Sequence, residues 1–304
     1  MKRGLLIGLL LLCAASIATA QREGTAGFSS FFNPQFKSEL PEEVKETSGL
    51  FFYNGRLWTQ NDSGGKPILY GLDTVTFEVV QKITLSNAKN KDWEDVCTDG
   101  EYVYVGDFGN NKGNRTNLRI YKFPLSDIPA EGNATVTVDT IRFRFADQTD
   151  FEKRTNLHDF DCEAVFATDE YLYLFSKGWA TGTTRLYRLS KKPGKHLAKV
   201  VNGFDSQGLV TGADYDRENH ILVVVGYVKS IWKPFMYLIF DFDEQGQNLS
   251  NHRFEMPQQL GCQTEGVCFF DEGKCFVSAE TSKVYSTRVF EVDFRKWIAE
   301  NRKK

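Results

Sequence analysis

Residues 163–179 read EAVFATDEYLYLFSKGW, and this stretch holds the pattern that decides the fold. A short apolar strand is followed by a turn with Asp169 and then by the alternating run Tyr171 to Phe175. After a polar loop, a third strand begins near Arg185. Alternating apolar and aromatic residues bounded by turn residues are typical of antiparallel β-strands and not of helices.

The same order of strand, turn, strand, loop and strand returns four more times along the chain. The other copies are Ser48–Asp73, Glu94–Pro124, Gly212–Asp243 and Glu265–Phe294. A segment that can supply a fourth strand follows each copy except the last: Phe77–Leu85, Thr135–Phe145, Leu197–Asn202 and Asn251–Glu255. Such repetition indicates that each copy forms one small antiparallel sheet.

The repeat predicts an all-β fold, a single β-propeller in which the sheets stand as blades around one axis. Five blades are expected, and six is the alternative because the step from Glu94 to Glu163 is the longest. Gln35–Leu40 can supply the strand that the last copy lacks, so that an N-terminal strand closes the ring without an exposed edge. Helical periodicity is almost absent before Arg295–Lys304, which excludes α/β folds and leaves a β-sandwich as the other alternative.

The first residues carry the features of a secretory signal peptide. Lys2 and Arg3 precede an apolar run, and Ala18-Thr19-Ala20 offers the small residues that signal peptidase reads. We therefore expect residues 1–20 to be a signal peptide, 21–34 a flexible N-terminal segment and 35–304 the propeller domain. Lipidation at Cys13 is disfavoured because Leu12 is not small. The mature chain is then expected to be exported, to the periplasm or the extracellular space, with no transmembrane segment.

Composition limits the partners of the mature chain. Without Lys2 and Arg3, 35 basic residues face 40 acidic ones, a balance of −5, and no basic tract occurs, so nucleic acid is not expected. Five cysteines remain after the signal peptide: Cys97, Cys162, Cys262, Cys268 and Cys275. A disulfide between Cys268 and Cys275 is an alternative, but buried free thiols are expected, and the spacings lack the paired C-x-x-C of a zinc site.

Aligned copies bring charged residues to one face of the predicted ring. In an antiparallel blade, the start of strand one, the end of strand two and the start of strand three share a face. Strand one begins with Glu94, Glu163 and Glu265, and Ser48 and Gly212 stand in the matching places. The ends of strand two carry Asp62, Asp107, Lys177, Tyr227 and Glu280, and strand three begins near Arg119, Arg185 and Arg288.

Glutamates that converge on one axis need compensation, because closely packed like charges are costly. One interpretation is that each Glu pairs with an Arg of its own or the next blade and ties the blades together. The other is a divalent cation, with calcium preferred because all the ligands are oxygen atoms. The residues leave both interpretations open.

Four polar loops flank the same face: Asn61–Gly65, Asp92–Asp95, Gly106–Asn111 and His158–Glu163. Each alone is typical of a turn, but together they indicate a site. Trp93 and Trp179 lie beside them and could stack a sugar, although aromatic residues also pack between blades. His158, flanked by Asp159 and Asp161, is the candidate general base, and Asp161 the second catalytic candidate. A hydrogen-bonded loop histidine is the alternative.

The motifs NDSGG (61–65), DWEDV (92–96), GDFGNN (106–111) with Arg115, and TEGV (264–267) resemble bacterial exported propellers grouped as esterase-like-phytase or gluconolactonase-like repeat proteins. The resemblance is specific from Ser48 to Phe123. Because related calcium-dependent propellers hold metal with acidic residues at the channel mouth, it implies a Ca²⁺ site at Glu94, Asp95, Glu163 and Glu265. The chain departs from the pattern at Ser48 and Gly212, where a carboxylate is missing.

The predicted cluster of charged residues at the channel mouth is compatible with three classes of function. The first is a propeller that binds a small anionic or carbohydrate ligand, or a protein partner. The second is a metal-dependent hydrolase of phosphate esters or lactones, and the third an electrostatic latch between blades. The predicted binding residues are Asn61, Asp62, Trp93, Asp107, Asn111, Arg115, Arg119, Lys177, Trp179, Arg185, Glu280 and Arg288.

Overall fold

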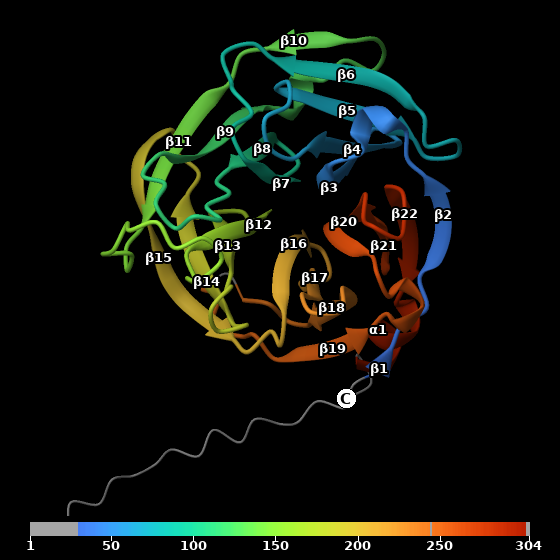
Figure 1. Cartoon of the computed structure of the whole chain (residues 1–304). Coiled ribbons are helices and arrows are strands. Elements are labelled where there is room, and N and C mark those ends of the chain that lie inside the picture. Colours follow the sequence, from blue (N-terminus) through green and yellow to red (C-terminus); the bar gives the residue numbers. More distant parts are fainter. Residues whose placement is uncertain (1–29, 244, 302–304) are drawn as a thin grey trace, which may run out of the picture.

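A computed structural model describes residues 30–243 and 245–301, and the predicted signal peptide lies outside this range. Figure 1 shows small sheets standing side by side around a common centre. The described chain is almost entirely β-structure. Its other elements are three 3₁₀ turns and one short helix, namely η1 (Glu42–Val44), η2 (Leu125–Asp127), η3 (Pro257–Gln259) and α1 (Arg295–Asn301).

Two sheets have five strands and one has four, and each runs outward from the centre. The first contains β3 (Thr47–Tyr53), β4 (Arg56–Asn61), β5 (Ile68–Asp73), β6 (Val79–Leu85) and β10 (Ala134–Val136). The second contains β16 (Leu209–Asp216), β17 (Ile221–Val228), β18 (Lys233–Ile239), β19 (Asn251–Glu255) and β1 (Ser30–Phe31). The third contains β20 (Gln263–Asp271), β21 (Lys274–Glu280), β22 (Arg288–Asp293) and β2 (Gln35–Glu39).

The remaining sheet has eight strands because two antiparallel sets join at their outer edges. One set is β7 (Trp93–Thr98), β8 (Tyr102–Asp107), β9 (Leu118–Pro124) and β11 (Asp139–Phe145). The other is β12 (Asp161–Ala167), β13 (Tyr171–Lys177), β14 (Thr184–Ser190) and β15 (Gly194–Phe204). β11 and β15 pair in parallel over Ile141 to Phe145, which forms a continuous seam on the outside of the molecule.

Apolar side chains fill the spaces between neighbouring sheets. Trp58 of the first sheet is buried against Phe51, with ring centroids 5.8 Å apart, in a cluster that includes Val96 and Val105 of the next sheet. Further clusters occupy the other spaces, which explains why strands β12, β13 and β17 are buried along nearly their whole length. Because both faces of these strands are apolar, each sheet must pack against a neighbouring sheet on either side.

Each of the five innermost strands contains a β-bulge near its start. In β12, Glu163 is the residue skipped between Cys162 and Ala164, and in β7 the ladder passes from Trp93 to Val96. The bulges in the other strands fall at Ser48-Gly49, Thr211 and Glu265-Gly266. A bulge frees one residue from the ladder and re-aims its side chain. Thr211, and not the expected Gly212, therefore matches Glu163.

The structure confirms several expectations about individual segments. β2 pairs antiparallel with β22, and a fourth strand follows each of the other copies. The predicted flexible segment 21–34 extends too far, because Ser30 and Phe31 pair with β19 and Phe32 is buried. All the cysteines in the described part are buried free thiols, as predicted. No helix in residues 30–243 and 245–301 is long and apolar enough to cross a membrane.

Candidate functional site

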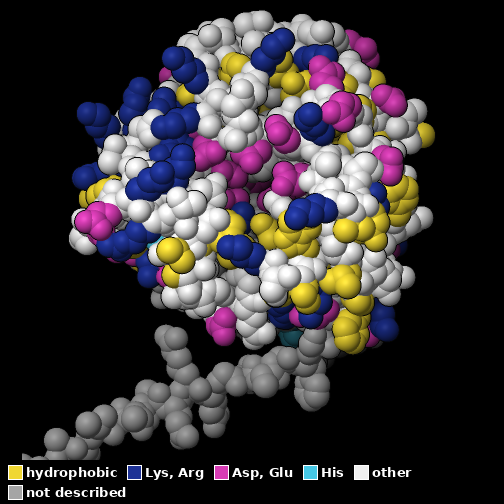
Figure 2. Space-filling model, viewed as in Figure 1, with side chains coloured by type: hydrophobic (Ala, Val, Ile, Leu, Met, Phe, Trp, Pro, Cys, Tyr) yellow, Lys and Arg dark blue, Asp and Glu magenta, His cyan; other side chains and the backbone are white. Residues whose placement is uncertain are grey.

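A polar cavity of about 280 Å³ opens at the centre of the ring. Figure 2 shows acidic side chains gathered in the hollow at the middle of this face. The residues that line the cavity come from all four sheets: Ser48, Asp62, Glu94, Asn111, Glu163, Lys177, Trp179, Tyr227, Lys229, Trp232, Gln263, Glu265 and Glu280. The structure thus brings Glu94, Glu163 and Glu265 to one place, as the aligned copies predict.

Three carboxylates at the edge of the cavity can share a cation: Asp62 and Glu94 line the cavity, whereas Asp92 lies beside them outside its lining. Asp62, Asp92 and Glu94 each offer an oxygen, and these oxygens lie within 4.8 Å of one another. Glu94 is only 5% exposed and none of the described residues donates a hydrogen bond to its carboxylate, while Oδ1 of Asp62 is buried without a partner. Buried carboxylate oxygens without donors are costly. The arrangement is therefore suited to a positively charged ligand.

The floor of the cavity contains a buried ion pair. Nζ of Lys177 lies 3.0 Å from Oε2 of Glu163, and neither side chain is more than 6% exposed. Lys177 also lies beside aromatic rings, with Nζ 4.9 Å from the centre of Trp179 and 5.6 Å from that of Tyr227. Burial lowers the pKa of Lys177, but Glu163, Tyr227, Glu265 and Asp161 together raise it by more, so its pKa lies well above the usual range and the amine stays charged.

A second acidic pair, Glu265 and Glu280, also lines the cavity and is bridged by an amide. Nε2 of Gln263 donates to Oε1 of Glu265 at 2.7 Å and also to Oε1 of Glu280. Burial raises the pKa of Glu265 to about 8 and that of Glu280 to about 7, against the lowering effect of Lys177 on both. One lysine and one amide do not neutralise Glu265 and Glu280, so these carboxyl groups hold protons near neutral pH.

The same effects act on the possible cation ligands. Burial raises the pKa of Asp62 to about 7, and repulsion by Asp92 and Glu280 adds to the shift. Burial and then repulsion by Glu163 hold the pKa of Glu94 well above its usual range. The cavity concentrates negative charge at a cost that protons, or a cation in their place, would relieve.

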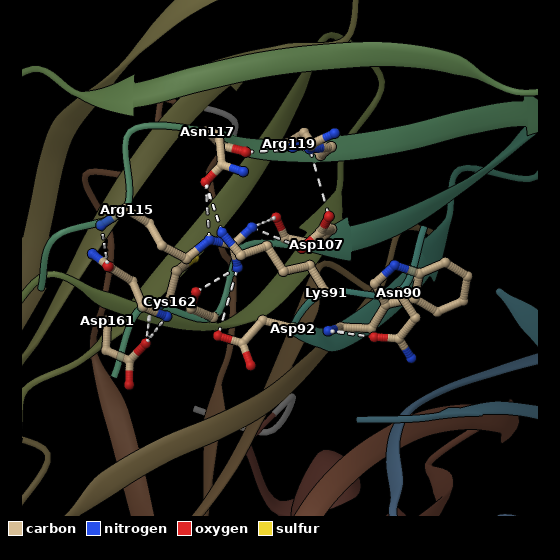
Figure 3. Close-up of polar contacts among 12 residues, drawn as sticks. Asn90, Lys91, Asp92, Asp107, Arg115, Asn117, Arg119, Asp161 and Cys162 are labelled. Atoms are coloured by element: carbon tan, nitrogen blue, oxygen red, sulfur yellow. Dashed lines mark hydrogen bonds and ion pairs between the residues drawn. The ribbon is translucent and has the colours of Figure 1, made fainter. Parts of the chain in front are cut away.

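Arg115 fixes the loop that supports this site. Figure 3 shows its guanidinium between Asp92 and Asp107. Nη2 lies 2.8 Å from Oδ1 of the buried Asp107, Nη1 donates to the carbonyl of Gly109 at 2.6 Å, and Asp92 lies 3.6 Å away. Arg115 and Asp107 therefore hold the Gly106–Asn111 loop and position Asp92 near Glu94. Neither residue lines the central cavity.

Asp95, an expected calcium ligand, does not reach the cavity. Its two carboxylate oxygens accept hydrogen bonds from the backbone N–H groups of Val96 and Val165, each at 2.8 Å, and a further one comes from Ala213. The side chain is wholly buried and connects strands β7, β12 and β16. Successive side chains of a strand point to opposite faces, so Glu94 and the adjacent Asp95 of β7 do not both face the cavity. Asp95 is a structural contact between inner strands.

The two catalytic candidates, His158 and Asp161, are both engaged in hydrogen bonds to their surroundings. Nδ1 of His158 accepts from the N–H of Phe160 at 3.0 Å, and Nε2 lies 3.2 Å from the carbonyl of Asn111. Asp161 accepts from the N–H groups of Asn110 and Cys162 and from Nε1 of Trp179. These contacts position loops, and neither side chain lines the cavity.

Other predicted binding residues also lie away from the cavity. Trp93 is buried in the core, where its Nε1 donates to the carbonyl of Lys89. Asn61 binds the backbone of Glu43 and Glu46. Strand three of each blade lies about 10 Å from the innermost strand, which places its arginines outside: Arg119 pairs with Asp107, Arg185 with Asp147 and Arg288 with Glu39. Among residues 30–243 and 245–301, no arginine forms an ion pair with Glu94, Glu163 or Glu265, so the expected Glu–Arg latch is not found there.

Sequence reasoning missed Lys229, Trp232 and Gln263 as lining residues. Lys229 and Trp232 follow β17 and belong to the turn before β18, where the aligned copies differ most. Gln263 stands two positions before Glu265, so it lies on the same side of the extended strand. That period of two was a usable signal.

No protein-family model and no curated protein matches the sequence. Similar solved structures include a glucose dehydrogenase, with a TM-score of 0.47 and 9% identity over 84% of this chain and 99% of that one. A gluconolactonase from Xanthomonas campestris has a TM-score of 0.39 and 10% identity, covering 88% of this chain and 98% of that one. The WD40 domain of Toxoplasma gondii coronin has a TM-score of 0.37 and 11% identity, covering 88% and 75%.

Proposed function

We propose that the chain is a single five-bladed propeller, closed by β2, which binds Ca²⁺ at Asp62, Asp92 and Glu94 and a small ligand above it. The observation that carries this proposal is the carboxylate of Glu94, which is 5% exposed, receives no hydrogen bond from any described residue and lies close to two further carboxylates. All the candidate ligands are oxygen atoms, the donor type that Ca²⁺ prefers. Glu163 is paired with Lys177 and Glu265 accepts a hydrogen bond from Gln263, so neither is among the proposed ligands.

The rest of the cavity fits an anionic or carbohydrate ligand. Lys177 at the floor and Lys229 at the side can attract an anionic group, while Trp179 and Trp232 offer flat apolar surfaces of the kind that stack on sugar rings. A cation bound by the three carboxylates would supply a further positive charge. The proposed ligand is therefore a small anion or an acidic sugar, bound in the exported protein outside the cytoplasm.

Hydrolysis of a phosphate ester or lactone is the second candidate function. It is supported by Glu280 and Glu265, whose pKa values of about 7 and about 8 would let them transfer protons near neutral pH. A bound cation would polarise the substrate. Binding ranks ahead because His158 has both ring nitrogens occupied and Asp161 accepts three hydrogen bonds.

Calorimetric titration of the metal-free protein with CaCl₂ tests the proposal. We expect one Ca²⁺ per chain, with binding lost in Glu94→Gln. The matched control is Glu280→Gln, because Glu280 lines the same cavity but is not among the three clustered carboxylates. Equal loss in both variants would mean that Ca²⁺ responds only to the total charge of the cavity. Turnover of a generic lactone or phosphodiester that requires Ca²⁺ would favour the hydrolase.

A further inference from the structure

A second groove, of about 410 Å³, lies on the outside of the molecule where β9, β11 and β15 run side by side. Its lining includes Arg119, Arg142, Arg144, Lys195 and His196, and contains no carboxylate. Figure 2 shows Lys and Arg side chains concentrated on the side of the molecule formed by β11 and β15. The groove shares no residue with the central cavity.

Three of these cations form a row across three adjacent strands. Arg142 of β11 stands directly opposite Arg119 on the antiparallel neighbour β9 and opposite Lys195 on the parallel neighbour β15. Adjacent strands lie about 4.8 Å apart, so the row spans about 10 Å. Like charges in directly opposite positions destabilise a sheet. The row of three cations therefore lowers the stability of the sheet, so the stability of the fold does not account for it.

Little within the protein compensates this charge. Arg119 has an ion pair with Asp107, whose oxygen lies 3.5 Å from Nε. Arg142, Arg144 and Lys195 are exposed, and no carboxylate in the part of the chain that the structure describes forms an ion pair with them. The whole chain carries a net charge of −3, so the row is a local concentration of positive charge and not a general property of the surface.

We propose that this groove binds a linear acidic polysaccharide through its carboxylate or sulfate groups. Guanidinium groups form paired hydrogen bonds with such oxyanions, and a row of about 10 Å is longer than one oxyanion, so it matches a chain with repeated charges. Thr116 and Asn117 add hydrogen-bonding groups for sugar hydroxyls. A single-stranded nucleic acid would need exposed aromatic side chains for base stacking, whereas Phe143, the aromatic residue of the lining other than His196, is 3% exposed.

Binding of fluorescent dextran sulfate to the intact protein, measured by anisotropy in 150 mM NaCl, tests the proposal. We expect the double variant Arg142→Ser, Lys195→Ser to bind about tenfold more weakly, because it removes two of the charges that face the polymer. The control variant Lys283→Ser, Lys296→Ser makes the same change in net charge at exposed positions outside the groove and should bind within about twofold of the natural protein. Uncharged dextran should not bind.

The thermal stability of the groove variant gives a second test. If the substituted residues had only a structural role, Tm would fall together with binding. Removing two opposed like charges should raise Tm while it weakens binding, which separates loss of a site from loss of folding. An equal loss in both double variants would overturn the proposal, as would absence of dextran sulfate binding by the natural protein. Binding of single-stranded DNA as tight as that of dextran sulfate, or of inorganic sulfate as tight as that of the polymer, would overturn the choice of a polysaccharide.

Discussion

Nζ of Lys177 lies 3.0 Å from Oε2 of Glu163 at the floor of the central cavity, and both side chains are almost completely buried. Removing one member of such a pair leaves an uncompensated charge out of water. We expect Lys177→Met to lower the free energy of unfolding by about 3 kcal/mol. Urea denaturation at pH 7 measures the change.

The double variant Lys177→Met, Glu163→Gln should recover part of this loss, because it removes both charges. Lys229→Met, which changes an exposed lysine on the rim of the same cavity, is the control and should have little effect on stability. If Lys177→Met and Lys229→Met proved equally mild, the ion pair would not be buried as described.

The cavity carboxylates should make the metal-free protein less stable as pH rises. Asp62, Glu280 and Glu265 have folded-state pKa values of about 7, 7 and 8, above those of the unfolded chain. The folded state then binds more protons than the unfolded state in this range, so the free energy of unfolding should fall from pH 5 to pH 8, with each of the three groups contributing up to about 1.4 kcal/mol per pH unit below its folded-state pKa. Denaturation curves in EDTA at four pH values measure this slope.

Calcium should oppose the slope, because the ion replaces the protons that are released. In 5 mM CaCl₂ (about fifty times a Kd of order 10⁻⁴ M), we expect the stability at pH 8 to exceed that in EDTA by about 2 kcal/mol. Glu94→Gln should abolish this difference. A calcium effect that is as large at pH 5 as at pH 8 would contradict competition between the ion and protons.

Arg115 should be irreplaceable by lysine. Its guanidinium contacts Asp107, the Gly109 carbonyl and Asn117 at once, a set that an ammonium group does not reproduce. Arg115→Lys should lower the free energy of unfolding by about 2 kcal/mol. Arg119→Lys is the matched control, because its ion pair with the same Asp107 is 3.5 Å long and more exposed. Equal stability of the two variants would show that the Gly106–Asn111 loop does not depend on the guanidinium group of Arg115.

Asp95 gives a test that separates structure from metal binding. Both of its oxygens accept backbone hydrogen bonds, so the amide nitrogen in Asp95→Asn would face an N–H group. We expect a loss of about 2 kcal/mol in unfolding free energy with the calcium response retained. Loss of the calcium response at unchanged stability would restore Asp95 as a ligand.

The repeat in the sequence predicted the strands well because each copy carries the same alternation. Asn251–Glu255 is a strand at the expected residues, and Gln35–Glu39 pairs with the last sheet. The convergence of Glu94, Glu163 and Glu265 was also predictable, because aligned positions of a repeat fall at the same place in each sheet.

Directions of side chains could not be obtained in the same way. Periodicity does not reveal a β-bulge, and therefore it could not show that Thr211, and not Gly212, occupies the position that matches Glu163. Distance from the axis was equally hidden: Arg119 and Arg185 occupy aligned positions, but they lie two strands away from the centre and meet Asp107 and Asp147 there. The ion pair between Asp92 and Arg115 joins two loops, and their relative position could not be predicted from the pattern of strands.

The bulge shared by the inner strands has a consequence for how such a protein can diversify. The skipped residue contributes no rung to the ladder, so Ser48, Thr211 and Glu163 can differ in chemistry while their strands keep the same registration with their partners. Substitutions at these positions can therefore change the chemistry at the centre of the ring one sheet at a time, without a change in how the strands pair. Two of these positions already carry hydroxyl groups bound to neighbouring backbone, at Ser48 and Thr211.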